Sequence, residues 1–95
     1  MSLYKLKFTN YSIKEWDKLD TTIKIQFHKK LKSILVNPKN NKNKLKGYDN
    51  IYKIKLKSSG YRLAYEVKEK EIVVLVLKIG KRDKFYKLLD KFFNN

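Results

Sequence analysis

The stretch that decides the fold covers residues 52–63 and reads YKIKLKSSGYRL. Apolar and cationic residues alternate in its first half, so an extended strand here has one apolar face and one face with three amines. Small residues follow, and Gly60 can adopt a positive φ angle without strain, which favours a tight turn. The chain then alternates again. We therefore predict a β-hairpin that brings Lys53, Lys55 and Arg62 together on one face.

The composition indicates one globular domain that spans residues 1–95, because a chain of this length supports a single modest core. Hydrophobic residues make up 42% and charged residues 35%, which is typical of a folded protein. The absence of cysteine excludes disulfides, and a single histidine disfavours a zinc site. Apolar runs of signal-peptide or membrane-spanning length are missing, so we expect a cytoplasmic protein without a membrane partner.

The formal net charge of +15 predicts a polyanionic partner, either RNA or DNA, or an acidic protein. A lysine-rich coding bias is the alternative explanation for part of this charge. Against that background the arginines are informative, because Arg62 and Arg82 are the two arginines among 24 basic residues. A planar guanidinium binds phosphate or carboxylate through two atoms, so both positions are candidates for anion binding, with chance or a structural ion pair as the alternative.

The rest of the chain predicts an α+β domain. In chain order the expected elements are a strand at 4–8, a helix from an N-cap at Asn10 or Ser12 to Leu19, a helix at 22–36, a polar loop at 37–47, the hairpin, a central strand at 72–77 that residues 78–82 leave, and a helix at 83–93. This β-α-α-β-β-β-α order predicts a small antiparallel four-stranded sheet with two N-terminal helices packed on one face and a C-terminal helix. The uncovered face would carry the hairpin cations, and Arg82 would join them from the end of the central strand.

Several kinds of chemistry find no support in the sequence. It contains no phosphate-binding glycine loop, zinc motif or cysteine nucleophile, and nine carboxylates among 24 cations disfavour a magnesium cluster. We therefore expect no cofactor and no metal. Metal-free RNA cleavage remains, since RNA supplies its own nucleophile, the 2′-hydroxyl group. Clustered lysines lower one another's pKa and can serve as a base, and Tyr86, one helical turn after Arg82, could stack on a base or position the hydroxyl.

The chain resembles the RelE toxins of the RelE/ParE toxin–antitoxin superfamily over nearly its whole length. The resemblance rests on KEWDKL at 14–19, NKLKG at 43–47, the hairpin at 52–63 and GKR at 80–82. It implies a RelE/ParE-like fold and a metal-independent endoribonuclease that cuts mRNA in the 30S A site of the ribosome. The implied products are a 2′,3′-cyclic phosphate and a 5′-hydroxyl, and the implied outcome is inhibition of translation. It also implies a RelB-like antitoxin that forms a hetero-oligomer with the toxin, which is a monomer when free.

The resemblance also implies roles for individual residues. Lys55 corresponds to the general base, Arg82 to the group that assists the leaving oxygen, and Lys53 and Arg62 to the groups that stabilise phosphoryl charge. Tyr86 matches the family's C-terminal tyrosine only if two residues are deleted after Arg82. Contacts to RNA and the ribosome are expected from Lys44, Lys46, Lys57 and Lys81, of which Lys46 replaces an arginine of RelE. The order of proton transfers stays open, because coupled lysines titrate as a set.

Three other functions remain open at this point. A ParE-like toxin shares the fold and inhibits DNA gyrase through protein contacts, without nuclease activity. A basic nucleic-acid-binding module would bind without catalysis, and its binding would weaken with salt. An inactivated toxin is the third possibility. The presence of the Lys53, Lys55, Arg62 and Arg82 set favours the nuclease.

Overall fold

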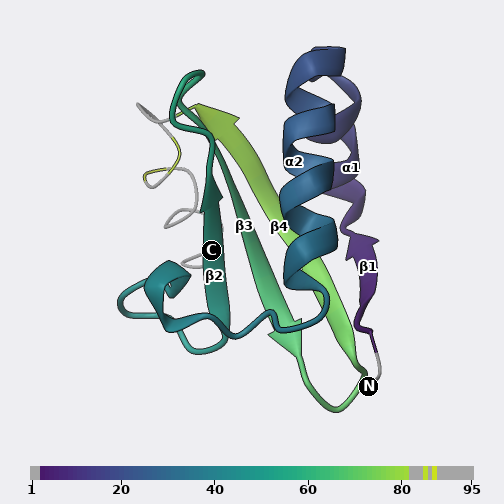
Figure 1. The fold of residues 1–95 in the computed structure, drawn as a ribbon, viewed down its shortest axis with the longest axis vertical. Coiled ribbons are helices and arrows are strands. Elements are labelled where there is room, and N and C mark those ends of the chain that lie inside the picture. Colours follow the sequence, from purple (N-terminus) through teal and green to yellow (C-terminus); the bar gives the residue numbers. More distant parts are fainter. Residues whose placement is uncertain (1–2, 82–84, 86, 88–95) are drawn as a thin grey trace.

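The computed structural model describes residues 3–81 together with Phe85 and Lys87 (Figure 1). Its elements are β1 (Lys5–Phe8), α1 (Asn10–Asp17), α2 (Thr21–Ile34), a 3₁₀ helix η1 (Asn41–Asn43), β2 (Ile51–Lys55), β3 (Tyr61–Lys68) and β4 (Val73–Lys81). Their order agrees with the predicted α+β domain. Arg82, Tyr86 and the helix predicted at 83–93 lie outside the described residues, apart from Phe85 and Lys87.

The four strands form one mixed sheet in the order β1-β4-β3-β2. The β2–β3 hairpin and the β3–β4 pair are antiparallel, but β1 runs parallel to β4, with Lys5 opposite Val73 and Phe8 opposite Val76. The prediction of a wholly antiparallel sheet was therefore wrong. Alternation of apolar and polar residues shows that a segment is a strand but not its direction, and the crossover through two helices allows a parallel pair.

β4 is a central strand, as its apolar sequence predicted, but it is longer than expected. It continues to Lys81, whereas residues 78–82 were predicted to leave it. Pairing with β3 extends to Tyr61 opposite Lys81 and keeps these residues in the ladder. The ladder contains one bulge, because Tyr65 lies opposite Val76 and Ala64 opposite Lys78, which leaves one extra residue on β4.

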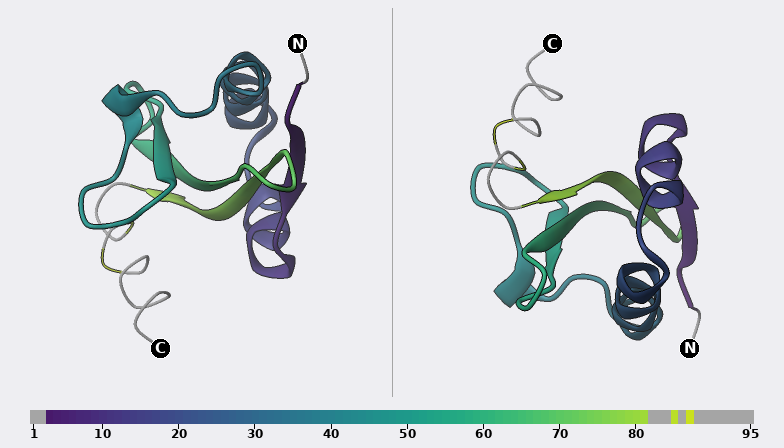
Figure 2. Two further views of the ribbon diagram at one scale, coloured as in Figure 1. Left: turned by 90° about the horizontal axis from the view of Figure 1, so that it is seen from below. Right: turned by 90° about the horizontal axis from the view of Figure 1, so that it is seen from above.

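α2 packs on one face of the sheet through Ile23, Phe27 and Leu31, which join the main hydrophobic core (Figure 2). The helix begins one residue before the predicted 22–36 range and ends two residues earlier, with Asp20 at the N-cap position but without a capping hydrogen bond from its side chain. The buried Tyr65 of β3 donates a hydrogen bond of 2.8 Å from its hydroxyl to the carbonyl oxygen of Pro38, which follows α2 in the chain. This bond ties the loop after α2 to the sheet.

α1 begins after Thr9, which is the N-cap instead of the predicted Asn10 or Ser12. The hydroxyl of Thr9 accepts the N–H of Ser12 at 2.9 Å, and the hydroxyl of Ser12 accepts the N–H of Thr9 at 3.0 Å. Ser12 therefore belongs to the cap as the third helical residue, in a reciprocal capping box. In the described part of the chain, neither helix is long and apolar enough to span a membrane.

The two helices are placed differently, which corrects the prediction that both pack on one face. α1 lies beside β1 and along the edge of β4 (Figure 2), and its Trp16 reaches the main core, with its ring centroid 5.4 Å from that of Phe8. The opposite face of the sheet has a smaller apolar cluster of its own. That cluster consists of Leu45, Ile51, Ala64, Leu77 and Phe85.

Candidate active site

The hairpin register brings the predicted cations together. Lys55 lies directly opposite Arg62, and Lys53 lies opposite Ala64, two positions further along the ladder. Alternate residues of a strand point to the same face, so Lys53, Lys55 and Arg62 share the face that α2 does not cover. Arg62 in turn lies opposite Gly80 on β4. We call Lys53, Lys55 and Arg62 the hairpin cations below.

The hairpin cations differ in exposure. Lys55 is exposed, whereas Lys53 and Arg62 are partly buried, and the Nε and Nη1 atoms of Arg62 are buried. A partly buried cation on a sheet is held in a narrow range of positions, and its charge is less screened by water than that of a surface lysine. The site therefore combines two restrained cations with one lysine that is free to reach a ligand.

Small residues lie between these cations. Ala64 is fully buried opposite Lys53, and Gly80 lies opposite Arg62. The buried Phe85 lies on the same face, because a Cβ atom added to Gly80 would come within 3.8 Å of its ring. The chain at Phe85 is thus close to the ladder position of Arg62.

The lysines predicted to contact RNA lie in the loop before β2, in the turn after β2 and at the end of β4. Lys44 forms an isolated bridge with Tyr52 at the outer edge of β2, and the exposed Lys46 follows in the same loop. This loop lines an open hollow of about 600 Å³. Lys57 is exposed in the turn after β2, and Lys81 ends β4 with its ammonium 5.6 Å from the ring centroid of Tyr61.

The structure adds two features that the sequence did not predict. Lys30 of α2 donates a hydrogen bond of 2.8 Å to the backbone carbonyl of Lys55. Glu15 of α1 contacts both the side chain of Lys78 and the backbone of Ile79 near the end of β4. Both contacts join residues far apart in the sequence, and neither has a local pattern. Among residues 3–81, Phe85 and Lys87, the structure shows no cluster of three or more metal-ligating His, Cys, Asp or Glu side chains.

The comparisons with known proteins identify the family of this chain. A family model described as the ParE toxin of type II toxin–antitoxin system, parDE, matches residues 6–86. The mRNA interferase toxin RelE of Escherichia coli K12 is 47% identical over 81 residues, which cover 85% of each chain. The chain belongs to the RelE/ParE toxin family. The resemblance predicted from the sequence is confirmed.

Solved structures of RelE/ParE toxins share the fold. The free state of an E. coli RelE variant with two arginines replaced by alanine has a TM-score of 0.88 and 40% identity, with 98% of both chains covered. RelE in the intact E. coli RelBE toxin–antitoxin complex has a TM-score of 0.81 and 47% identity, with 82% of this chain and 95% of that chain covered.

The geometry suits chemistry at a phosphate group. Three basic side chains from two alternate ladder positions on one face of a rigid hairpin can lie around one phosphodiester. Charge-assisted hydrogen bonds from such preorganised donors strengthen as negative charge develops on the phosphoryl group. Of the small residues opposite Lys53 and Arg62, Ala64 shares an apolar cluster with Phe85 and Gly80 lies next to its ring, so an aromatic side chain adjoins the cations on this face.

Proposed function

We propose that this RelE/ParE toxin is an mRNA interferase: a ribosome-dependent, metal-independent endoribonuclease that cleaves mRNA in the 30S A site and thereby inhibits translation. The observation that carries the proposal is the placement of Lys53, Lys55 and Arg62 on one face of the β2–β3 hairpin, where Lys55 lies opposite Arg62 and Lys53 lies two positions further along β2. The relative named mRNA interferase toxin RelE, with 47% identity, supports the same activity.

In the proposed reaction, the 2′-oxygen of the nucleotide before the scissile bond attacks its own 3′-phosphorus. A P–O2′ bond forms, the P–O5′ bond breaks, and the products are a 2′,3′-cyclic phosphate and a 5′-hydroxyl. One proton leaves the 2′-hydroxyl and one reaches the departing 5′-oxygen, so no water is consumed. Lys55, the exposed one of the three residues, accepts the first proton when its side chain is a neutral amine.

The partly buried Lys53 and Arg62 stabilise the charge on the non-bridging oxygens. Arg82 and Tyr86, which lie outside the described residues, are proposed to assist the leaving 5′-oxygen and to stack on a base or position the 2′-hydroxyl, respectively. The position of Arg62 opposite Gly80, two residues before Arg82, supports a shared site. The ribosome would supply much of the alignment by holding the mRNA in an attack-ready geometry.

Two partners follow from this function. Lys44, Lys46, Lys57 and Lys81, in the loop before β2, the turn after it and the end of β4, are proposed to contact phosphates of mRNA and rRNA. A toxin that acts on ribosomes in this way would work in the cytoplasm. A RelB-like antitoxin is the second partner, since an E. coli relative was solved as a RelBE complex. The charge of +15 suits an acidic antitoxin segment that folds on the toxin, and the free toxin would be a monomer.

The test uses ribosomes programmed with a vacant A site, in EDTA, beside the same mRNA without ribosomes. The expected result is cleavage on ribosomes that leaves a 2′,3′-cyclic phosphate and is lost in the Arg82→Ala variant. Lys32→Ala, which removes a charge from an exposed position on α2, is the control and should cleave normally.

Intact mRNA on ribosomes with a folded wild-type toxin would overturn the proposal. The ParE description of the matching family model makes gyrase inhibition the second candidate, to be assayed with supercoiling reactions in that event.

A further inference from the structure

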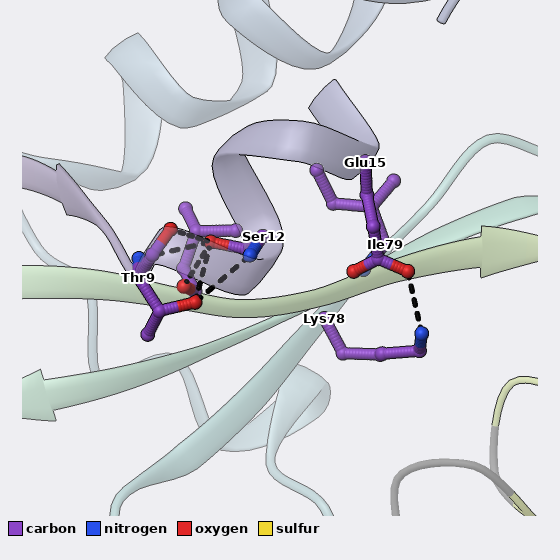
Figure 3. A network of polar contacts seen from close by, with 6 residues as sticks. Thr9, Ser12, Glu15, Lys78 and Ile79 are labelled. Carbon is purple, nitrogen blue, oxygen red and sulfur yellow. Dashed lines mark hydrogen bonds and ion pairs between the residues drawn. The ribbon is translucent and has the colours of Figure 1, made fainter. Parts of the chain in front are cut away.

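The edge of β4 that faces away from β3 pairs with β1 along only part of its length. β1 covers this edge only as far as Phe8, which lies opposite Val76. Beyond that point, side chains of α1 take over (Figure 3). The hydroxyl of Ser12 donates to the carbonyl of Val76 at 2.7 Å, and the carboxylate of Glu15 accepts the backbone N–H of Ile79 at 3.1 Å. A helix thus supplies hydrogen bonds that a neighbouring strand would otherwise make.

The second oxygen of Glu15 holds Lys78. Its Oε2 lies 2.5 Å from the ammonium of Lys78, which is 5% exposed and lies 4.8 Å from the ring centroid of Tyr11. A buried ion pair is weak evidence for stability, because desolvation of the two charges offsets their attraction. Such a pair does fix the orientation of its members. Lys78 therefore holds the carboxylate in the position from which its other oxygen meets Ile79.

The anchored backbone leads directly into the candidate active site. Ile79 precedes Gly80, the ladder partner of Arg62. The β-bulge at Ala64/Tyr65 lies just before this point and disrupts the regular pairing of β3 with β4. After the bulge, β3 binds one edge of β4 and Glu15 binds the other at Ile79. The strand end that carries Lys81 and leads to Arg82 is therefore held from both sides.

We propose that Glu15 is a positioning residue of the active site. Its hydrogen bond to Ile79 keeps the end of β4 in place, so that Gly80 stays opposite Arg62. Lys78 acts through Glu15 by orienting the carboxylate. This inference rests on the proposed nuclease function, and its test includes a readout that does not depend on cleavage.

The sharpest test compares two double variants, Glu15→Gln/Lys78→Met and Glu15→Ala/Lys78→Met. Both remove the two charges of the pair, so neither leaves a buried charge without its partner. They differ in the acceptor oxygen, because glutamine keeps one for the N–H of Ile79 and alanine does not. Glu69→Ala serves as the control, since it removes a carboxylate that pairs with Lys39 on the exposed surface.

Single-turnover cleavage and ribosome affinity are measured at a temperature where all variants are folded. We expect the alanine double variant to cleave about 10- to 100-fold more slowly at unchanged ribosome affinity, because small misplacements of catalytic groups have effects of this size. The glutamine double variant should cleave faster than the alanine double variant because it keeps the acceptor oxygen, but more slowly than the wild type because Lys78 no longer orients that side chain. A rate for the alanine double variant equal to that of the wild type, or no difference between the two double variants, would overturn the inference.

Amide hydrogen exchange of Ile79 tests the anchor by itself. Exchange should be slow in the wild type and in the glutamine double variant, and faster in the alanine double variant. Fast exchange in the wild type would overturn the anchor even if cleavage is normal. Conversely, a wild-type toxin that leaves mRNA intact but shows slow exchange at Ile79 would contradict the nuclease proposal, and with it the positioning role, while leaving the anchor itself established.

Discussion

Lys30 of α2 and Lys55 of β2 are joined by a hydrogen bond from a side-chain ammonium to a backbone carbonyl, 2.8 Å long. The contact fixes the end of β2 from the side of the sheet opposite to the hairpin cations. It links a helix on one face to the proposed general base on the other. The backbone of Lys55 is thereby restrained while its side chain stays exposed.

Replacing Lys30 by methionine should slow single-turnover cleavage on ribosomes, because the strand end that carries Lys55 loses this restraint. The free energy of unfolding should fall by no more than about 1 kcal/mol, since the lost hydrogen bond is exposed. Lys29→Met is the matched control, because Lys29 lines the same 350 Å³ cavity and carries the same charge. If Lys30→Met and Lys29→Met slow cleavage equally, the loss of positive charge explains the effect and the hydrogen bond to Lys55 does not.

Replacing Arg62 by alanine should lower the single-turnover rate by about 100- to 1,000-fold, the usual effect of removing one donor to developing negative charge. Arg62→Lys keeps the charge but loses the planar fork, so it should recover only part of the rate. The measurement is the rate at saturating ribosomes, with Lys32→Ala as the reference for charge loss. Full activity of Arg62→Lys would argue against a two-point phosphate contact.

Replacing Tyr65 by phenylalanine should lower the free energy of unfolding by about 1–3 kcal/mol, because the buried carbonyl of Pro38 loses its donor. Urea unfolding at neutral pH measures this loss, and Tyr61→Phe is the control. If Tyr65→Phe and Tyr61→Phe lower the free energy of unfolding by similar amounts, the hydrogen bond to Pro38 does not account for the loss.

Burial raises the pKa of Tyr65 above its ordinary value of 10.0, so this residue also predicts a pH dependence. A raised pKa in the folded state means that the folded protein binds the proton more tightly than the unfolded chain. The contribution of Tyr65 is therefore complete below about pH 10 and is lost as the pH rises further. The wild type should lose more stability than Tyr65→Phe between pH 9 and about pH 11. Parallel loss in both proteins would contradict this assignment.

Replacing Ile72 by asparagine should stabilise the protein. Ile72 has a φ angle of 55° although its side chain is β-branched, and it is 41% exposed, so little burial is lost. Left-handed backbone costs such a residue about 1–2 kcal/mol, whereas asparagine tolerates it. We expect a gain of about 1 kcal/mol in urea unfolding. Val36→Asn, at an exposed position without a positive φ angle, should bring no gain.

Local patterns in the sequence were sufficient for the hairpin and the two helices. The alternation around Gly60 predicted both the turn and the shared face of the hairpin cations, because these features depend on neighbours along the chain. The cap of α1 was off by one residue, since Thr9, Asn10 and Ser12 are all capping residue types. Only the reciprocal bonds between Thr9 and Ser12 distinguish them.

Features that depend on distant parts of the chain could not be predicted in the same way. The parallel direction of β1 follows from how it meets β4, nearly 70 residues later. Glu15 and Lys78 are separated by 63 residues, and each alone looks like an ordinary surface charge. The roles of the hairpin cations, of Arg82 and of Tyr86 came from the family resemblance and stay predictions.

The parallel pairing of β1 with β4 also bears on how the protein is made. The first strand is synthesised long before its partner, so it cannot join the sheet until Val73–Val76 exist. Contacts between such distant segments are costly to form early, and they slow folding. A chain truncated after residue 72 should therefore lack a native sheet, which circular dichroism of that fragment can check. In that fragment β4 is missing, so the α1 side chains that bind its edge would have no partner. An unfinished toxin would therefore be inactive even though its hairpin cations are already present.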